Sequence, residues 1–256
     1  MSLVELIRFV LLIYCMNVFF IIGLKRSGNH AIINWLYKMI PNYIHLNNMK
    51  ISDINKKNYY SFKKNDDKII DTNYCDKKWI PFTIKNNLII SFEDKDLVHL
   101  KSAITNFCND LKISHNVIII LRSPLNNFAS FWQIYKTDKS LLINLIERWK
   151  LYAIESLEKL YFNDACLIVY DKWFNDVKYR ERLASELGLK FDDSNLNSIF
   201  KHGVSSFDGY NYINSAQNMD VLNRCKNFEA DTDFKSFTSD PLIQEIWHKL
   251  KEKEKI

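Results

Sequence analysis

The stretch Phe19-Phe20-Ile21-Ile22-Gly23-Leu24-Lys25-Arg26-Ser27-Gly28-Asn29-His30 decides the fold. It joins a short apolar run, 18–22, to a segment with helical spacing, 29–40, through a loop bounded by two glycines. Glycines let a backbone turn tightly, and the N–H groups and dipole at a helix start attract an anion. Lys25 and Arg26 add positive charge in the same turn. The sequence therefore predicts a strand, a phosphate-binding loop and a helix.

The loop departs from the phosphate loop of kinases and ATPases directly after Gly28. That pattern requires a lysine and then a serine or threonine, whereas this chain has Asn29 and His30. The cations stand at the front of the loop instead. Taken alone, the glycine spacing also fits a tight strand-to-helix turn that binds nothing.

Further short apolar runs, rich in β-branched residues, lie at 88–90, 117–121 and 167–169. Segments with helical spacing lie at 95–110, 124–136, 141–161 and 173–188. Short buried strands that alternate with helices predict an α/β fold, a three-layer α/β/α arrangement around a central, mainly parallel sheet. Pro124 suits the first position of a helix, and Gly188 suits the position just after one.

The domain organisation is interpreted as one domain over residues 16–256, with an irregular insertion at about 47–80 that is rich in Lys, Asn and Asp. Residues 1–15 are interpreted as an N-terminal extension or a mis-assigned start. The apolar run Phe9–Leu24 is short for a membrane span, which needs about 20 residues. Its second half is also required as the strand before the loop, so no membrane association is expected.

The composition is that of a globular protein, with 256 residues of which 47% are hydrophobic and 25% charged. The net charge of +5 suits an anionic ligand but falls short of the basic face of nucleic-acid-binding domains, so no nucleic-acid partner is expected. The five cysteines include no CxxC pair, which argues against a zinc site and a disulfide framework. A reducing, cytoplasmic location and a metal-free site are the corresponding expectations.

A second motif follows the apolar run 117–121. Arg122 comes directly after this strand, and Ser130 lies eight residues later on the predicted helix. An arginine fork and a hydroxyl suit a terminal phosphate, although a lone arginine can equally cap the sheet. Both motifs follow predicted parallel strands, at the sheet edge where open α/β proteins bind ligands.

Together, the two motifs resemble those of the sulfotransferase family in its bacterial or viral form, over residues 17–228. Arg26-Ser27-Gly28-Asn29-His30 is similar to the family's 5′-phosphosulfate loop, and Arg122 and Ser130 have the spacing of its 3′-phosphate pair. The resemblance implies a P-loop NTPase-like fold and a donor, 3′-phosphoadenosine 5′-phosphosulfate (PAPS). The implied donor-binding residues are Lys25, Arg26, Ser27, Gly28, Asn29, His30, Arg122 and Ser130. Arg26 would also help the leaving oxygen to depart.

Two later stretches extend the resemblance. Leu167–Phe174 is similar to the family's strand and the Tyr-acidic segment that follows it, with Tyr170 in a structural role. Gly203–Asp208 resembles a loop that closes over the nucleotide, which implies donor contacts from Ser205 and Ser206. Arg224 is a further candidate donor contact. A Ser/Gly surface loop is the alternative interpretation of Gly203–Asp208.

The implied reaction needs a base that takes the proton of the acceptor. In the family this base is a histidine or glutamate just after the third strand, a position that matches Glu93 here. The alternative interpretation of Glu93 is a solvated acid at a helix N-terminus. His99 and Asp53 are further candidates, whereas His30 is interpreted as a residue of the helix start.

The resemblance thus implies a PAPS-dependent sulfotransferase that acts on a hydroxyl or an amine without a metal. The acceptor is unknown. Tyr59, Tyr60, Trp79 and Trp132 could stack on a carbohydrate, although aromatic residues in these numbers more often pack in a core or on a surface. Two alternatives stay open. One is a divergent P-loop nucleotide kinase or NTPase, and the other is a domain that binds PAPS or its product PAP without catalysis.

Overall fold

The computed structural model describes residues 17–54, 69–71, 87–198, 205, 207–209, 211–212 and 215–256. The chain divides into two compact units. The first comprises Met1–Ile22, Ile40–Ile118 and Tyr161–Ala165, and the second comprises Gly23–Met39, Ile119–Leu160 and Cys166–Ile256. The expected extension at 1–15, the donor contact Ser206 and the aromatic residues Tyr59, Tyr60 and Trp79 lie outside the described residues.

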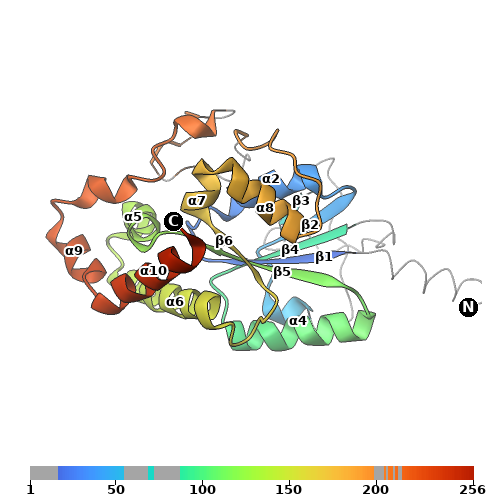
Figure 1. The fold of residues 1–256 in the computed structure, drawn as a ribbon. Helices are drawn as coiled ribbons and strands as arrows, with labels where there is room; N and C mark the ends of the chain where they lie inside the picture. Colours follow the sequence, from blue (N-terminus) through green and yellow to red (C-terminus); the bar gives the residue numbers. More distant parts are fainter. Residues whose placement is uncertain are drawn as a thin grey trace, which may run out of the picture. The chain divides into compact units, whose positions relative to one another are not determined.

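The described strands form a six-stranded sheet in the order β3-β2-β4-β1-β5-β6 (Figure 1). Their bounds are β1 Val18–Gly23, β2 Tyr43–Asn47, β3 Ile69–Asp71, β4 Asn87–Glu93, β5 His115–Leu121 and β6 Cys166–Val169. The central sheet is parallel and is flanked by helices, and β1 leads through the glycine loop into α2. These features confirm the predicted α/β fold class.

The helices lie close to where the sequence predicts them. Their bounds are α2 Asn29–Met39, α3 Ile51–Ile54, α4 Leu97–Leu111, α5 Pro124–Tyr135, α6 Lys139–Glu158, α7 Tyr170–Asn175, α8 Val177–Glu186, α9 Thr232–Thr238 and α10 Pro241–Glu254, with 3-10 helices η1 Ala216–Asn218 and η2 Arg224–Phe228. Pro124 stands in the first turn of α5, as expected. Gly188, at φ +67°, ends α8, where its N–H donates to the carbonyl of Ser185 over 3.0 Å.

Two stretches differ from the sequence-based expectation. The helix predicted at 173–188 is two helices, because the carboxylate of Asp176 accepts from the N–H of Tyr179 over 3.1 Å and begins α8 afresh. The strand β2 was not predicted, and the described part of the insertion expected at 47–80 contains α3 and β3. These elements are short and lack the long apolar run that identifies a buried strand.

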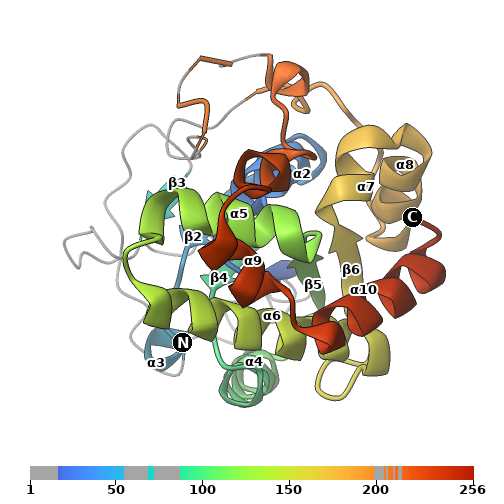
Figure 2. The ribbon, with the colours of Figure 1, turned by 90° about the vertical axis from the view of Figure 1, so that its left-hand side faces the viewer.

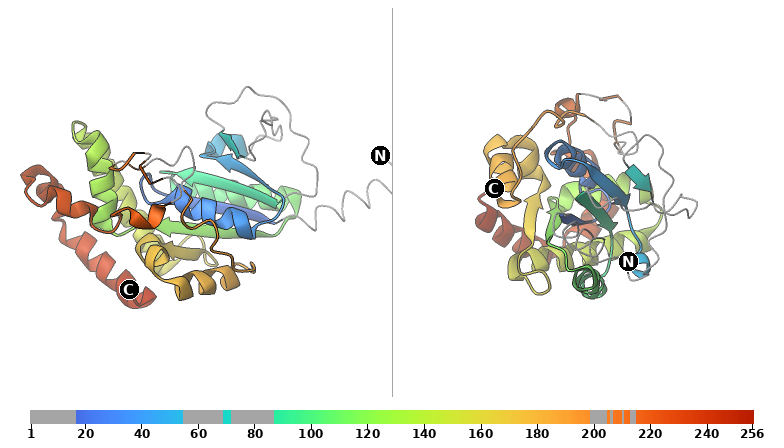
Figure 3. Two further views of the ribbon diagram at one scale, coloured as in Figure 1. Left: turned by 90° about the horizontal axis from the view of Figure 1, so that it is seen from above. Right: turned by 90° about the vertical axis from the view of Figure 1, so that its right-hand side faces the viewer.

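In the first unit, β2 lies between β3 and β4 and pairs in parallel with both (Figure 3). The core beside these strands is aromatic. The ring of Phe20 stacks on Phe92 at 6.4 Å between centroids and meets Phe107 edge-on at 5.8 Å. These large apolar contacts hold β1, β4 and α4 together.

In the second unit, α5, α6, α9 and α10 pack side by side (Figure 2). Trp149 of α6 is fully buried, and its ring meets Phe128 of α5 at 6.0 Å and Trp247 of α10 at 6.4 Å. Its indole N–H also donates to the carbonyl of Arg122 over 3.0 Å. The helical core therefore holds the backbone of Arg122 directly. Within the described ranges, no helix is both long enough and apolar enough to cross a membrane.

Candidate functional site

The glycine loop is braced from inside by two buried polar side chains, Ser27 and Asn29. The Asn29 amide donates to the carbonyl of Leu24 over 3.0 Å, and the Ser27 hydroxyl lies 2.7 Å from the same oxygen. Gly23 makes room for this arrangement, because a Cβ there would lie 2.0 Å from Asn29 Oδ1. Both side chains are engaged within the loop, and the backbone N–H of Ser27 also donates to the Leu24 carbonyl over 3.2 Å, so the loop is held in a tight turn.

Two loop residues have left-handed backbone conformations. Arg26 has φ +66° and Gly28 has φ +93°. For a residue with a Cβ, this conformation costs roughly 1–2 kcal/mol, so Arg26 holds a strained backbone in the middle of the loop. Strain of this kind concentrates at binding and catalytic sites, where the surrounding contacts enforce it.

Gly28 packs directly against the aromatic ring of Tyr170 at the start of α7. A Cβ at residue 28 would lie 2.1 Å from Tyr170 Cδ2. Gly28→Ala is therefore expected to lower the free energy of unfolding by about 1–3 kcal/mol for overpacking, with about 1 kcal/mol more for the left-handed backbone. Chemical denaturation measures this loss.

The matched control for this substitution is Gly188→Ala. Gly188 has a similar φ of +67°, but a Cβ there would meet nothing within 4 Å. The free energy of unfolding of Gly188→Ala should therefore fall only by the cost of the left-handed backbone, about 1 kcal/mol. Equal losses at the two positions would contradict the close packing of Gly28 on Tyr170.

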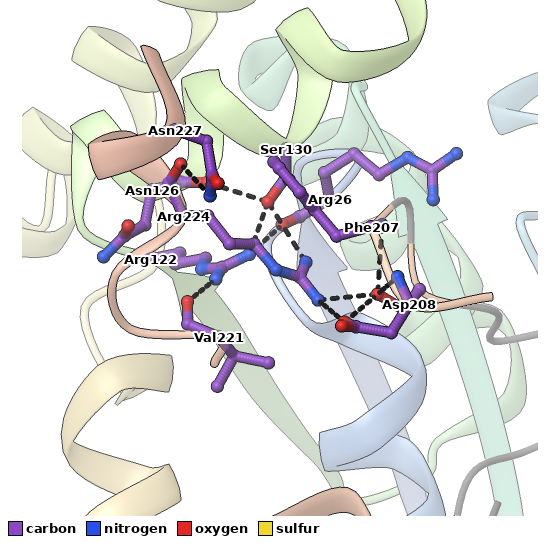
Figure 4. Close-up of polar contacts among 10 residues, drawn as sticks. Arg26, Arg122, Asn126, Ser130, Phe207, Asp208, Val221, Arg224 and Asn227 are labelled. Atoms are coloured by element: carbon purple, nitrogen blue, oxygen red, sulfur yellow. Dashed lines mark hydrogen bonds and ion pairs between the residues drawn. The ribbon is translucent and has the colours of Figure 1, made fainter. Parts of the chain in front are cut away.

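Arg122, at the end of β5, is the centre of the site and is 2% exposed. Its Nη1 donates to the carbonyl of Arg26 over 3.2 Å and to the hydroxyl of Ser130 over 2.9 Å (Figure 4). Its Nη2 donates to the carbonyl of Val221. One guanidinium thus joins the glycine loop to α5, and the predicted partnership of Arg122 and Ser130 is present in the structure.

Arg224, in η2, meets the same serine from the other side (Figure 4). Its Nη1 lies 3.2 Å from Ser130 Oγ, and its Nη2 lies 2.8 Å from Ser205 Oγ and 3.3 Å from Asp208 Oδ2. The predicted contacts Arg122, Ser130, Ser205 and Arg224 therefore lie together, within the second unit. We call these four residues, with Asp208, the arginine cluster.

The arginine cluster has more positive charge than its own carboxylate balances. Burial lowers the pKa of Arg122, and burial followed by the charge of Arg122 lowers the pKa of Arg224 to about 10. The Nε atoms of both arginines are buried with no hydrogen-bond partner among the described residues. Buried donors without acceptors are costly, and a phosphate oxygen is the acceptor that guanidinium groups bind best. The cluster therefore fits a phosphate group.

Two residues that sequence reasoning missed hold the cluster together. The Asn126 amide donates to the carbonyl of Leu222 over 2.6 Å, and its Oδ1 accepts from the N–H of Cys225 over 3.1 Å, so α5 holds η2. The Asp171 carboxylate accepts from both the N–H and the hydroxyl of Ser123, over 2.7 and 2.6 Å. The sequence signals for them are indirect: Asn126 comes four residues after the strand-end Arg122, and Asp171 is the acidic residue that follows the end of β6.

The remaining loop residues occupy different surroundings. The side chain of Arg26 points away from the arginine cluster, which it touches only through its carbonyl (Figure 4). Lys25 is exposed, and its carbonyl accepts from the Asn127 amide over 3.0 Å. His30 is partly buried in the first turn of α2. Lys25 is exposed and Arg26 is half-buried, and the role of both residues in binding a ligand at the loop stays a prediction.

The candidate bases belong to the first unit. Glu93 is partly exposed at the end of β4, and its N–H lies 3.4 Å from Asn48 Oδ1. The side chain of His99 is 78% exposed and lies 3.1 Å from Asp96, as in an ordinary first helical turn. Asp53 is partly exposed in α3. Glu93 thus has the strand-end position that the sequence predicts, and its role as base stays a prediction.

Trp132 does not have the exposed position that stacking on a sugar requires. It is 3% exposed, packs against Phe234 and Phe237 at 6.0 Å, and donates its indole N–H to Asp231 over 3.0 Å. It is a core residue between α5 and α9. In the ranges that the structure describes, no group of three or more His, Cys, Asp or Glu side chains could hold a metal ion.

Comparisons with known proteins find likeness in structure only. No family model and no curated protein matches the sequence. Mouse sulfotransferase SULT7A1 complexed with PAP aligns with 93% of this chain and 84% of its own, at a TM-score of 0.49 and 13% identity. The sulfotransferase domain of the Synechococcus PCC 7002 olefin synthase aligns with 91% of this chain and 94% of its own, at a TM-score of 0.46 and 12% identity. Both proteins are named as sulfotransferases.

Proposed function

We propose that this chain is a sulfotransferase that moves a sulfuryl group from PAPS to a hydroxyl or an amine. The observation that carries the proposal is the arginine cluster beside the glycine loop. Arg122 donates to both Ser130 and the Arg26 carbonyl, so one residue connects two sites that each suit a phosphate. A ligand with phosphates at two positions is the natural partner of such a pair.

Each part of the site has a separate task in this proposal. Arg122, Arg224 and Ser130 would hold the 3′-phosphate through charged hydrogen bonds and a hydroxyl. The backbone N–H groups at the start of α2, with Lys25 and Arg26, would hold the 5′-phosphosulfate. The bound donor supplies the sulfuryl group. The Arg26 guanidinium would neutralise the negative charge that develops on the leaving oxygen, which is how fixed positive groups accelerate such transfers.

The kinase or NTPase alternative fits the loop less well. A Walker loop needs a lysine at the position of Asn29, yet the Asn29 side chain is buried and bonded to the Leu24 carbonyl inside the loop. It cannot reach a phosphate from there. We expect no magnesium-dependent ATP hydrolysis, and a metal-dependent release of phosphate from ATP would favour the NTPase alternative.

A thermal-shift series tests the proposed class of ligand. A ligand that binds only the folded state raises the melting temperature in step with its affinity. We expect 3′-phosphoadenosine 5′-phosphate to stabilise the protein more than ADP, ATP or GTP at equal concentration, since only it presents a phosphate to each site. A ranking led by ATP or GTP would contradict the proposal.

Glu93→Gln tests catalysis separately from binding. The amide cannot take a proton at neutral pH, so transfer of radiolabelled sulfate from PAPS should be lost while donor affinity is retained. Glu245→Gln, which removes an exposed charge on α10, is the control and should leave both unchanged. Retained turnover would exclude Glu93 as the base. Donor binding by the wild type without turnover on a broad acceptor panel would support the non-catalytic alternative.

The acceptor is proposed only at the level of chemical class. The aromatic residues Tyr59, Tyr60 and Trp79 favour a carbohydrate hydroxyl, because flat rings stack on sugar faces. Screening transfer onto simple glycans and onto aryl alcohols distinguishes these classes. Transfer to aryl alcohols alone would contradict the carbohydrate proposal without affecting the donor assignment.

A further inference from the structure

Three consecutive carbonyl groups of the glycine loop, at residues 24, 25 and 26, each accept a hydrogen bond from a side chain. The Leu24 carbonyl accepts from Ser27 and Asn29, within the loop itself. The Lys25 carbonyl accepts from Asn127 over 3.0 Å, and the Arg26 carbonyl accepts from Arg122 over 3.2 Å. The last two donors come from α5 and from the end of β5, so the orientation of these two peptide units depends on residues about a hundred positions away.

These bonds decide which way the peptide N–H groups point. In a planar trans peptide, the N–H lies on the opposite side from the C=O, and the described residues contain no cis bond. With the Lys25 carbonyl turned toward Asn127, the N–H of Arg26 points away from α5. A carbonyl that faced a bound phosphate would repel it, whereas an N–H attracts it. Holding the carbonyls back is therefore part of building an anion site.

Asn127 is an unusual residue for a purely structural position. It is fully buried in α5, and its Oδ1 has no hydrogen-bond partner among the described residues. A buried acceptor without a partner costs roughly 1–3 kcal/mol. Leucine has nearly the same shape and would remove that cost. Among the described residues, the side chain of Asn127 donates to the Lys25 carbonyl, a bond that leucine could not make.

We infer that Asn127 is a positioning residue of the phosphate loop, whose amide holds the Lys25–Arg26 peptide in the orientation that accepts the 5′-phosphate group of a nucleotide. The inference rests on the proposed function, because it assumes that the loop binds the 5′ end of the donor. Asn127 itself does not touch the ligand. It acts through the backbone of the loop, independently of the contacts that Arg122, Ser130 and Arg224 make with a 3′-phosphate.

The two phosphate sites can be tested separately with two different nucleotides. 3′-Phosphoadenosine 5′-phosphate uses both phosphate sites, whereas adenosine 3′-monophosphate uses only the arginine cluster. In Asn127→Leu, the dissociation constant of the bisphosphate should rise about tenfold, the scale of one hydrogen bond of this type. The dissociation constant of the 3′-monophosphate should stay nearly the same. Isothermal titration calorimetry measures both.

The melting temperature supplies a second readout. Asn127→Leu removes an unsatisfied buried acceptor, so it should melt at or above the wild-type temperature while it loses affinity for the bisphosphate. A merely structural role predicts the reverse, a lower melting temperature and an unchanged ratio of the two constants. Asn127→Ala serves if the leucine variant does not fold, and should show the same selective loss of affinity.

Asn195→Ala is the matched control. The Asn195 amide donates to the carbonyl of Asn34 over 3.0 Å, a bond of the same type and length that does not involve the loop. Its removal should leave both constants unchanged. Equal weakening of both nucleotides in Asn127→Leu would overturn the inference and leave the proposed function standing. A wild-type protein that binds neither nucleotide would instead overturn the proposed function.

Discussion

Arg122→Ala is expected to weaken the binding of 3′-phosphoadenosine 5′-phosphate by roughly 1.5–3 kcal/mol, or about 10- to 150-fold. The substitution removes a buried guanidinium that donates to Ser130 and to the Arg26 carbonyl from one nitrogen. It therefore removes a proposed phosphate donor and releases the Arg26 carbonyl in the same step. Because Arg224 also contacts Ser130, part of the proposed 3′-phosphate site survives, and binding should weaken without disappearing.

Calorimetry with two lysine variants shows how much of this loss comes from geometry. Arg122→Lys keeps the charge but lacks the planar fork that reaches two acceptors at once, so it should lie between the wild type and Arg122→Ala. Arg180→Lys is the control, since Arg180 is similarly buried but pairs with Asp193 away from the arginine cluster. Unchanged affinity in Arg122→Ala would remove Arg122 from the donor site.

Arg26→Gly should have opposite effects on activity and stability. Loss of one group that stabilises developing charge lowers turnover by about 10²–10³-fold in comparable sites, and the same is expected for sulfuryl transfer here. The melting temperature should stay the same or rise, because glycine adopts the φ of +66° that strains arginine. The protein would then lose its chemistry without losing its fold.

The control for this prediction is Lys112→Gly. Lys112 is also a cationic residue in the left-handed region, with φ +50°, and it ends α4. It should show the same neutral or positive change in melting temperature with turnover intact. A clear fall in the melting temperature of Arg26→Gly would contradict the interpretation of Arg26 as a strained residue.

Local signals in the sequence predicted the parts of the site that a single strand-to-helix connection builds. The two glycines, Lys25 and Arg26 lie in one turn, and Arg122 and Ser130 are brought together by the first two turns of α5. The strands that precede these motifs are buried apolar runs, so their position was also predictable. In both cases the chain distance is short and the hydrophobic pattern is strong.

The parts that sequence reasoning missed depend on contacts between distant segments. Asn126 and Asn127 are adjacent and chemically identical, yet one holds η2 and the other holds the glycine loop. The packing of α5 decides which of the two asparagines faces η2 and which faces the glycine loop. The short strand β2 and the break at Asp176 were missed for a related reason, because tertiary pairing and one capping carboxylate outweigh local hydrophobic periodicity there.

The side chain of Asn29 is turned into the loop, and this limits which residues the loop can accept at position 29. Replacing Asn29 by lysine, as in ATP-hydrolysing loops, would delete the bond to the Leu24 carbonyl and the contact with Ser27. It would also place a longer side chain beside Gly23, where even an added Cβ would meet residue 29. A single substitution toward an ATPase-type loop would therefore damage the loop, and a lysine at position 29 would need compensating substitutions around Gly23 and Leu24.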